Sequence, residues 1–403
     1  MKELLTKPIK LYNTIQHYEW GTINEEAFIT DLLGIMPEKD KPYAELWIGA
    51  HQKSPSLFEY NGRLIDLNFL IDEFPEEILG YKVAEMFNNK LPFLLKVLSA
   101  RKALSIQTHP NKEQARQLHK ESPENYPDEN HKPEIAVALD RLYALVGIKP
   151  VSEIKKVFES FTFLSDYFLP KTLSEMFQSE DVDKERLVKN FMSELLQIEK
   201  SGKISEVLKL IEESLTARQH LSIDEELFLK NKKQFLDDVG LLAFLFFNFV
   251  SVDEGEGFYT DAGIPHAYLQ GNIVECMANS DNVVRAGLTP KFKDVKTLLN
   301  ILRYSNDQPT VIPSNSSVHR YITDAKEFEL IRFSLQADDR INYPVNNRIC
   351  VFIIIEGEIE LEIDFDGNKY QFHKGESFMI PAINKNLLCL SLSSATLFMA
   401  TVP

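Results

Sequence analysis

A change in the hydrophobic pattern in the middle of the chain most constrains how this sequence can fold. Between about residues 150 and 236 the hydrophobic pattern is helical. This stretch contains only one glycine, and its only prolines are Pro150 and Pro170. One apolar stripe at helical spacing consists of Leu187, Phe191, Leu195 and Ile198. On both sides of the stretch, short apolar runs alternate with Gly and Pro, as is typical of β-strands. The sequence therefore predicts a mainly β protein with an α-helical insertion.

The C-terminal ninety or so residues show the clearest strand pattern. Ile359, Leu361 and Ile363 alternate with acidic residues, and Asp366-Gly367 is a strong hairpin signal. Short strands separated by turns favour a jelly roll or a related β-barrel. No set of metal ligands is visible in this part, and His373 is expected at the surface.

Charge excludes two classes of partner. Lys and Arg number 44 against 60 Asp and Glu, a formal net charge of −16 over 403 residues. Such a surface repels nucleic acid and anionic membranes, so we expect neither as a partner. An anionic ligand would need a local cationic pocket.

Compartment and assembly follow from what the chain lacks. Its three cysteines, Cys276, Cys350 and Cys389, are an odd number without CxxC spacing, so no disulfide framework is expected. The first residues lack the apolar core of a signal peptide. The longest apolar run, residues 241–250, is about half of what a bilayer requires. We expect a cytoplasmic protein and treat it as a monomer.

Three separate segments carry candidate metal ligands. Gln107 and His109 lie two residues apart on an expected strand, so their side chains face the same space. Glu134 opens an apolar strand, and His266 follows a Gly-x-Pro turn. Each fragment alone also suits an ordinary turn, edge or core residue. Together, two imidazoles, a carboxylate and an amide suit Zn²⁺, although Gln is an uncommon zinc ligand.

Further polar residues lie near these ligands in the sequence. Lys132 and Ser105 are each two residues from a candidate ligand and share its face. Glu275 and Arg285 follow His266 in a polar segment. Lys96 lies inside the apolar run PFLLKVLSA, where it needs a partner or a cavity, unless it extends to solvent at an edge.

Several long blocks resemble the type I phosphomannose isomerases. They are YEWG, AELWIGAHQKSPS, LPFLLKVLSARKALSIQTHPNKEQA, DENHKPEIAVAL and GIPHAYLQGNIVECMANSDNVVRAGLTPKFKDV, in order between about residues 12 and 300. The resemblance implies cupin-like jelly-roll β-barrels plus a helical domain, and a zinc enzyme that interconverts mannose 6-phosphate and fructose 6-phosphate. We predict a catalytic barrel from residues 1–150 and 237–312, a helical domain at 151–236 and a C-terminal barrel at 313–403.

The resemblance also implies roles for individual residues. One Zn²⁺ per chain would be held by Gln107, His109, Glu134 and His266. The family's active-site arginine and lysine fall on Arg285 and Lys132. Beyond what the resemblance implies, we expect Glu275 and His131 to compete with Lys132 as proton carrier. A small-molecule sugar phosphate would contact Ser105, Lys96, Tyr268 and Lys291, together with Arg285.

The chain departs from the family pattern in loops. AHQKSPS lacks the His-Pro that many members have, Asp261 stands where proline is usual, and Ile264 stands where a polar residue is common. None of these departures removes an expected ligand.

Aldose–ketose isomerisation moves a proton between C1 and C2 through an enediol, which requires a base and a positive charge near the developing oxyanion. Lys132 is the first choice for this proton transfer, because burial beside Zn²⁺ and Arg285 would lower its pKa. Two alternatives remain open: an iron cupin oxygenase, and a non-catalytic sugar-binding or regulatory cupin. Lys132 with Arg285 favours the isomerase, since a binding protein needs no proton carrier beside a metal.

Overall fold

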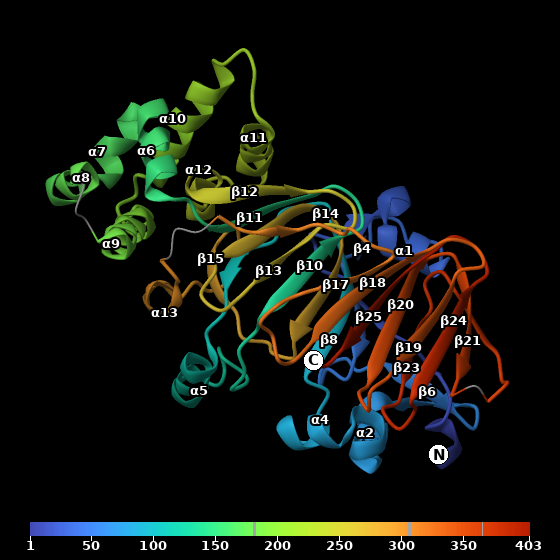
Figure 1. The fold of residues 1–403 in the computed structure, drawn as a ribbon. Helices are drawn as coiled ribbons and strands as arrows, with labels where there is room; N and C mark the ends of the chain where they lie inside the picture. Colours follow the sequence, from blue (N-terminus) through green and yellow to red (C-terminus); the bar gives the residue numbers. More distant parts are fainter. Residues whose placement is uncertain (180–182, 305–307, 365) are drawn as a thin grey trace.

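The computed structural model describes residues 1–179, 183–304, 308–364 and 366–403. Antiparallel β-sheets form most of it, and a group of helices projects from one side (Figure 1). This arrangement confirms the predicted mainly β fold with an α-helical insertion.

The largest sheet has eleven strands and contains every segment that carries a predicted metal ligand. Its strands are β2 (Thr14–Gln16), β5 (Glu45–Gly49), β8 (Phe93–Ala100), β9 (Ile106–Thr108), β10 (Glu134–Ala138), β11 (Leu142–Ile148), β12 (Phe247–Val252), β13 (Gly257–Thr260), β14 (His266–Ala278), β15 (Val284–Gly287) and β16 (Val311–Ile312).

Strand β14 closes this sheet on itself. Its first half pairs with β9 and β11, and its second half pairs with β8 and β10. Between the halves Gly271 has a φ of 132°, and a Cβ there would lie 2.8 Å from the carbonyl oxygen of Arg141. Glu134 is the register partner of Met277 at the end of β14, yet its carboxylate contacts His266 at the start of β14. Eleven extended residues would separate these ends by about 36 Å, so the sheet must curl into a barrel.

The C-terminal part contains two further sheets that pack face to face around an apolar core. One consists of β1 (Ile9–Leu11), β17 (Val318–Tyr321), β18 (Glu329–Leu335), β20 (Cys350–Glu356), β23 (Ser377–Ile380) and β25 (Ala395–Thr401). The other consists of β19 (Arg340–Pro344), β21 (Glu358–Ile363), β22 (Tyr370–His373) and β24 (Asn386–Ser391).

Two details of this part bear on the sequence predictions. The expected hairpin joins β21 to β22, with Glu358 opposite His373. Strand β1 comes from the N-terminus and pairs with β23, so residues near the start of the chain also build a C-terminal sheet. The division into domains remains a prediction. Two small sheets, β3 (Thr22–Ile23) with β4 (Pro42–Tyr43) and β6 (Leu57–Tyr60) with β7 (Arg63–Asp66), complete the strands of the described residues.

The helices fall into those outside and those inside the insertion. Outside it are α1 (Phe28–Leu33), α2 (Leu67–Glu73), α3 (Pro75–Leu79), α4 (Tyr81–Met86), α5 (Lys112–Glu121) and α13 (Val295–Ile301). The insertion contains α6 (Val151–Ser160), α7 (Ser165–Phe168), α8 (Lys171–Gln178), α9 (Lys184–Gln197), α10 (Ile204–Thr216) and α11 (Ile223–Phe235), followed by α12 (Ala243–Phe246). Short 3₁₀ turns are η1 (Lys2–Leu4), η2 (Asn24–Glu26), η3 (Thr162–Leu164) and η4 (Val239–Leu242).

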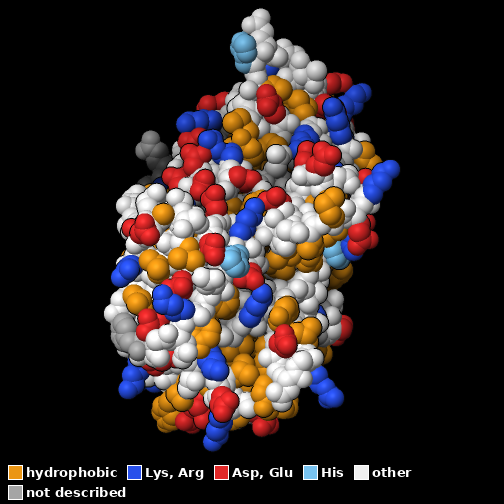
Figure 2. All heavy atoms as spheres, turned by 90° about the vertical axis from the view of Figure 1, so that its right-hand side faces the viewer, with side chains coloured by type: hydrophobic (Ala, Val, Ile, Leu, Met, Phe, Trp, Pro, Cys, Tyr) orange, Lys and Arg blue, Asp and Glu red, His pale blue; other side chains and the backbone are white. Residues whose placement is uncertain are grey.

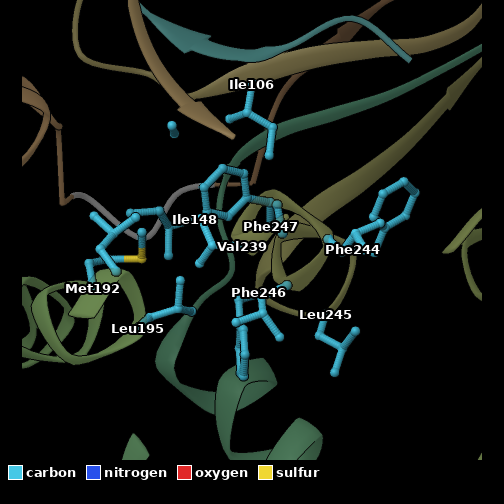
Figure 3. Packing of buried hydrophobic residues seen from close by; sticks show 14 of the residues in the cluster. Ile106, Ile148, Met192, Leu195, Val239, Phe244, Leu245, Phe246 and Phe247 are labelled. Atoms are coloured by element: carbon cyan, nitrogen blue, oxygen red, sulfur yellow. The ribbon is translucent and has the colours of Figure 1, made fainter. Parts of the chain in front are cut away.

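The predicted apolar stripe on α9 is buried, and it joins the helices to the barrel. Figure 3 shows Met192 and Leu195 of α9 beside Ile148 of β11, with Ile106 of β9 and Phe246 nearby. One continuous core therefore supports β9, the strand that carries Gln107 and leads directly into His109.

Two surface observations accompany the charge analysis. Acidic and basic side chains are interspersed across the face in Figure 2. Among the described residues, no helix combines the length and apolar character that crossing a membrane would require.

We predict that Phe191→Ala lowers the free energy of unfolding by about 3–5 kcal/mol, because Phe191 is fully buried and its ring lies 4.9 Å from that of Phe246. Urea unfolding followed by far-UV circular dichroism would measure this loss. Lys189→Ala on the exposed face of the same helix is the matched control and should change stability by less than about 0.5 kcal/mol. A loss below about 1 kcal/mol for Phe191→Ala would contradict the packing described.

Candidate active site

His109, Glu134 and His266 meet inside the barrel. One nitrogen of each histidine and one oxygen of Glu134 all lie within 4.8 Å of one another, the one such group of three or more ligand residues in the described part of the chain. His266 Nε2 lies 3.0 Å from Glu134 Oε2, and His109 Nε2 lies 3.5 Å from Glu134 Oε1. All three side chains are at most 1% exposed.

The outer nitrogens of the two imidazoles contact backbone carbonyls. His109 Nδ1 lies 2.7 Å from the carbonyl oxygen of Asn282, and His266 Nδ1 lies 3.0 Å from that of Ile264. A carbonyl can only accept, so Nδ1 must carry the proton in each ring. In the neutral ring, Nε2 then presents a lone pair toward Glu134.

These lone pairs need a cation between them. His109 Nε2, His266 Nε2 and Glu134 Oε2 are buried and have no hydrogen-bond partner among the residues described. Burial, with a contribution from Lys132, lowers the pKa of His109 to about 4, so this ring is neutral at pH 7. Burial alone would raise the pKa of Glu134, but Lys132 and His109 hold it well below its usual range. Two imidazoles and one carboxylate in a buried site fit a divalent transition metal.

Gln107 is placed beside this group by strand register. On β9 it lies directly opposite His266 and also opposite Arg285 on β15. Directly opposed residues in antiparallel strands present their side chains on the same face. Its role as a fourth ligand therefore remains a proposal with consistent geometry.

Lys132 lies in contact with the metal group. Its ammonium nitrogen is 2.8 Å from Glu134 Oε1, and both side chains are buried. The sequence predicted that Lys132 and Glu134 share one face of an extended segment, and the structure places their side chains in contact.

A second buried polar group lies along the same face of the sheet. Lys96 is the register partner of Glu275, and its ammonium is 3.2 Å from Glu275 Oε2. Tyr268 donates a hydrogen bond of 2.9 Å to Glu275 Oε1. Ala136 is the register partner of Glu275 on β10, so Glu134, two residues earlier, faces the same side as Lys96 and Glu275.

Burial and neighbouring charges shift the pKa values of this second group. Burial alone would lower the pKa of Lys96, but Glu45 and Glu275 raise it above its ordinary value, so Lys96 stays charged. Burial raises the pKa of Glu275, although Lys96 opposes that shift. Burial and the Glu275 carboxylate also raise the pKa of Tyr268 well above its ordinary value. Lys96 is therefore a buried, paired cation, and the alternative of an edge residue extending to solvent is wrong.

Two members of this group were not among the predicted site residues. Glu45 lies 3.3 Å from Lys96 and accepts a 2.5 Å hydrogen bond from the indole of Trp47. The Trp47 ring lies 5.4 Å from the Lys96 ammonium, which favours a cation–π contact. The signal was present in YAELWIGA, where an acid interrupts an apolar strand as Lys96 does in its own strand.

The remaining predicted residues lie at more open positions. Arg285 on β15 is half-buried, burial lowers its pKa, and none of the described acidic residues forms an ion pair with it. Ser105 is half-buried and Lys291 is exposed. His131 contacts Glu327 from the C-terminal part, with 2.8 Å between Nε2 and Oε1.

Fold and site together define a class of antiparallel β proteins with a helical insertion and a buried His/Glu/His site suited to a metal. Residues 9–151 match the catalytic domain of type I phosphomannose isomerases. Mannose-6-phosphate isomerase 2 of Arabidopsis thaliana is 35% identical over 91% of this chain and 87% of its own length. The rat mannose-6-phosphate isomerase is 40% identical over 72% of each chain. This chain belongs to the type I phosphomannose isomerase family.

Solved structures agree with that assignment. A zinc-bound mannose 6-phosphate isomerase superimposes with a TM-score of 0.86 at 28% identity, covering 98% of this chain and 99% of its own. An arginine-to-alanine variant of the Salmonella typhimurium phosphomannose isomerase gives the same TM-score, identity and coverage. The chain is an isomerase, so the predicted reaction class is confirmed over the oxygenase and the silent sugar-binding protein.

The His109 pKa predicts how the metal-free protein responds to acid. Unfolded chains protonate histidine near the ordinary value of 6.5, whereas folded His109 stays neutral down to about 4. The unfolded state therefore binds more protons in this window, and stability is lost as pH falls from 6.5 toward 4. The contribution of His109 to this loss is at most about 3 kcal/mol.

Urea unfolding of metal-free wild type and His109→Gln at pH 7, 6, 5 and 4.5 would test this. The variant should lose less stability across the window than wild type. His220→Gln, at an exposed position, should keep the wild-type slope. Identical slopes for wild type and His109→Gln would show that His109 is not buried in the neutral form.

Proposed function

We propose that this mannose-6-phosphate isomerase works with one Zn²⁺ held by Gln107, His109, Glu134 and His266. The enzyme interconverts mannose 6-phosphate and fructose 6-phosphate. The observation that carries the metal assignment is the convergence of three buried lone-pair atoms that lack protein donors among the described residues. A related enzyme with the same fold contains zinc.

The chemical difficulty is the removal of a weakly acidic proton beside a carbonyl. When bound, Zn²⁺ supplies positive charge that makes this proton more acidic, and with Glu134 as its one anionic ligand the site keeps a net charge near +1. The protein must then provide a proton carrier, further positive charge for the enediolate oxygens, and a cationic place for the phosphate.

Lys132 is our proposed proton carrier. Its ammonium nitrogen lies 2.8 Å from Glu134, within reach of any sugar that contacts the metal group. In the neutral form its amine accepts the proton from one carbon and returns it to the neighbouring carbon. Glu275 is less suited, because both of its oxygens already accept contacts, one from Tyr268 and one from Lys96.

Arg285 would stabilise the negative charge that develops on the sugar oxygens. Its half-buried guanidinium has no acidic partner in the described part of the chain, so it is available to an anion. With Ser105 and Lys291 it would also meet the phosphate, which provides the cationic pocket that a net charge of −16 requires. Lys96 and Tyr268 would contact the sugar while fixing the Glu275 carboxylate.

Location and assembly are also proposals. All three cysteines are free and buried, which suits the reducing cytoplasm. We propose a cytoplasmic monomer, and light scattering coupled to gel filtration should give one species of about 46 kDa.

Lys132→Met should lower kcat by about 10²–10⁴-fold while the metal content stays at one per chain, because general acid–base catalysis contributes that range. The assay couples fructose 6-phosphate formation from mannose 6-phosphate to a dye, and metal is measured on the same sample. Lys120→Met, at an exposed position of α5, is the control. Turnover within threefold of wild type would place the proton carrier elsewhere.

His266→Ala should lose zinc and activity together, whereas His220→Ala, exposed in the insertion, should keep both. A chelator should inactivate wild type, and added zinc should restore it. Elemental analysis also separates zinc from iron. A metal-free variant with full turnover would end the metal assignment.

A further inference from the structure

The loop between β14 and β15 fixes one of the two metal-facing imidazoles. Its residue Asn282 is fully buried, and its carbonyl oxygen lies 2.7 Å from His109 Nδ1. This carbonyl sets which nitrogen of His109 carries the proton, and with it the direction of Nε2. Hydrogen bonds of this kind orient metal ligands and raise their basicity. The position of residue 282 therefore matters for the metal group.

Asp128 holds that loop through side chain and backbone together. Its carboxylate accepts hydrogen bonds from the Ser280 hydroxyl at 2.8 Å, from the Asp281 backbone N–H at 2.7 Å and from the Asn282 side-chain amide at 3.1 Å. The same amide donates to the carbonyl oxygens of Asp128 and Asn130 at 2.7 and 2.9 Å. Ser280 is 2% exposed, and its hydroxyl also lies 3.1 Å from the carbonyl oxygen of Asn130, on the same loop as Asp128.

Asp128 also lies on the loop that carries the other side of the site. Lys132 and Glu134 follow it by four and six residues, just before and at the start of β10. The hydrogen bonds of Asp128 thus join the segment of Lys132 and Glu134 to the loop that orients His109. Neither loop contains a strand or helix of its own at these positions to fix this spacing.

We propose that Asp128 is a positioning residue, which through Asn282 holds His109 in the tautomer and orientation that bind the metal. The proposal rests on the zinc site of the proposed function. Without the Asp128 carboxylate, the Asp281 N–H loses its acceptor, and the loop must move to find another. The Asn282 carbonyl would then no longer be fixed against His109.

A second tether holds the same loop from another side. Lys53 lies 2.7 Å from the Asp281 carboxylate, and His51 Nε2 lies 3.4 Å from it. The Lys53 side chain is 67% exposed, and exposed pairs contribute little. Asp128 should therefore contribute more than Lys53 to the position of residue 282.

The test compares zinc affinity in folded Asp128→Ala, Asp128→Asn and Asn282→Ala by competition with a chelator of known affinity. We expect Asp128→Ala and Asn282→Ala each to weaken zinc binding by about 10–100-fold, the usual effect of losing such an outer partner. Asp128→Asn keeps one acceptor oxygen and should lie between wild type and Asp128→Ala. The double variant Asp128→Ala/Asn282→Ala should bind zinc no more weakly than the single variant with the lower affinity. Both changes disrupt the same link between residues 128 and 282, so their effects should not add.

Asp140→Ala is the matched control. Asp140 also accepts hydrogen bonds from the backbone N–H and the side-chain amide of one β14 residue, Asn272, but Asn272 forms no hydrogen bond with any of the four predicted metal ligands. The zinc affinity of Asp140→Ala should equal that of wild type. Cobalt-substituted protein gives a second readout, since a reoriented His109 changes the visible absorption of bound Co²⁺, which general destabilisation would not.

Zinc affinity within threefold of wild type in folded Asp128→Asn and Asn282→Ala, with an unchanged cobalt spectrum, would overturn the positioning role. These two variants decide the question if Asp128→Ala does not fold. Failure of wild type itself to bind zinc would instead overturn the proposed function, so the two failures are distinguishable.

Discussion

Two imidazole nitrogens and a carboxylate oxygen face one another in a buried space, and the hydrogen bonds on the far side of each ring leave lone pairs rather than protons between them. The backbone carbonyls of Asn282 and Ile264 take the proton of each ring on its far side. Three electron-rich atoms within 4.8 Å are unfavourable in this form unless a cation joins them. The sheet that encloses them, the loops that hold the rings and the lysines nearby are all arranged around that requirement.

Strand geometry in the barrel brings these side chains together. Because side chains alternate, Trp47, Lys96, Glu275 and Glu134 share one face across neighbouring strands. The bend at Gly271 then carries the start of β14, with His266 and Tyr268, back toward Glu134. The metal group and the buried group around Lys96 are therefore neighbours, and Glu134 influences the pKa of Glu275, Lys96 and Tyr268.

Sequence patterns predicted what depends on short-range periodicity. The stripe on α9, the strands around Lys96 and Glu134 and the hairpin at Asp366-Gly367 follow from spacing and turn residues alone. The role assignments of the metal ligands came from the family resemblance, since each fragment alone was weak. Glu45, Trp47 and Asp128 were missed for a different reason. Each of them contacts a residue dozens of positions away, and no local pattern shows which strands are neighbours or which loop a carboxylate will reach.

The central claim is that these side chains converge on one divalent ion. Anomalous diffraction from crystals of the zinc-loaded protein, collected on both sides of the zinc absorption edge, tests it most directly. The account predicts one strong peak per chain, about 2.0–2.2 Å from His109 Nε2, His266 Nε2 and an oxygen of Glu134. A zinc-loaded crystal with no peak at this position, or with its peak on other ligands, would contradict it.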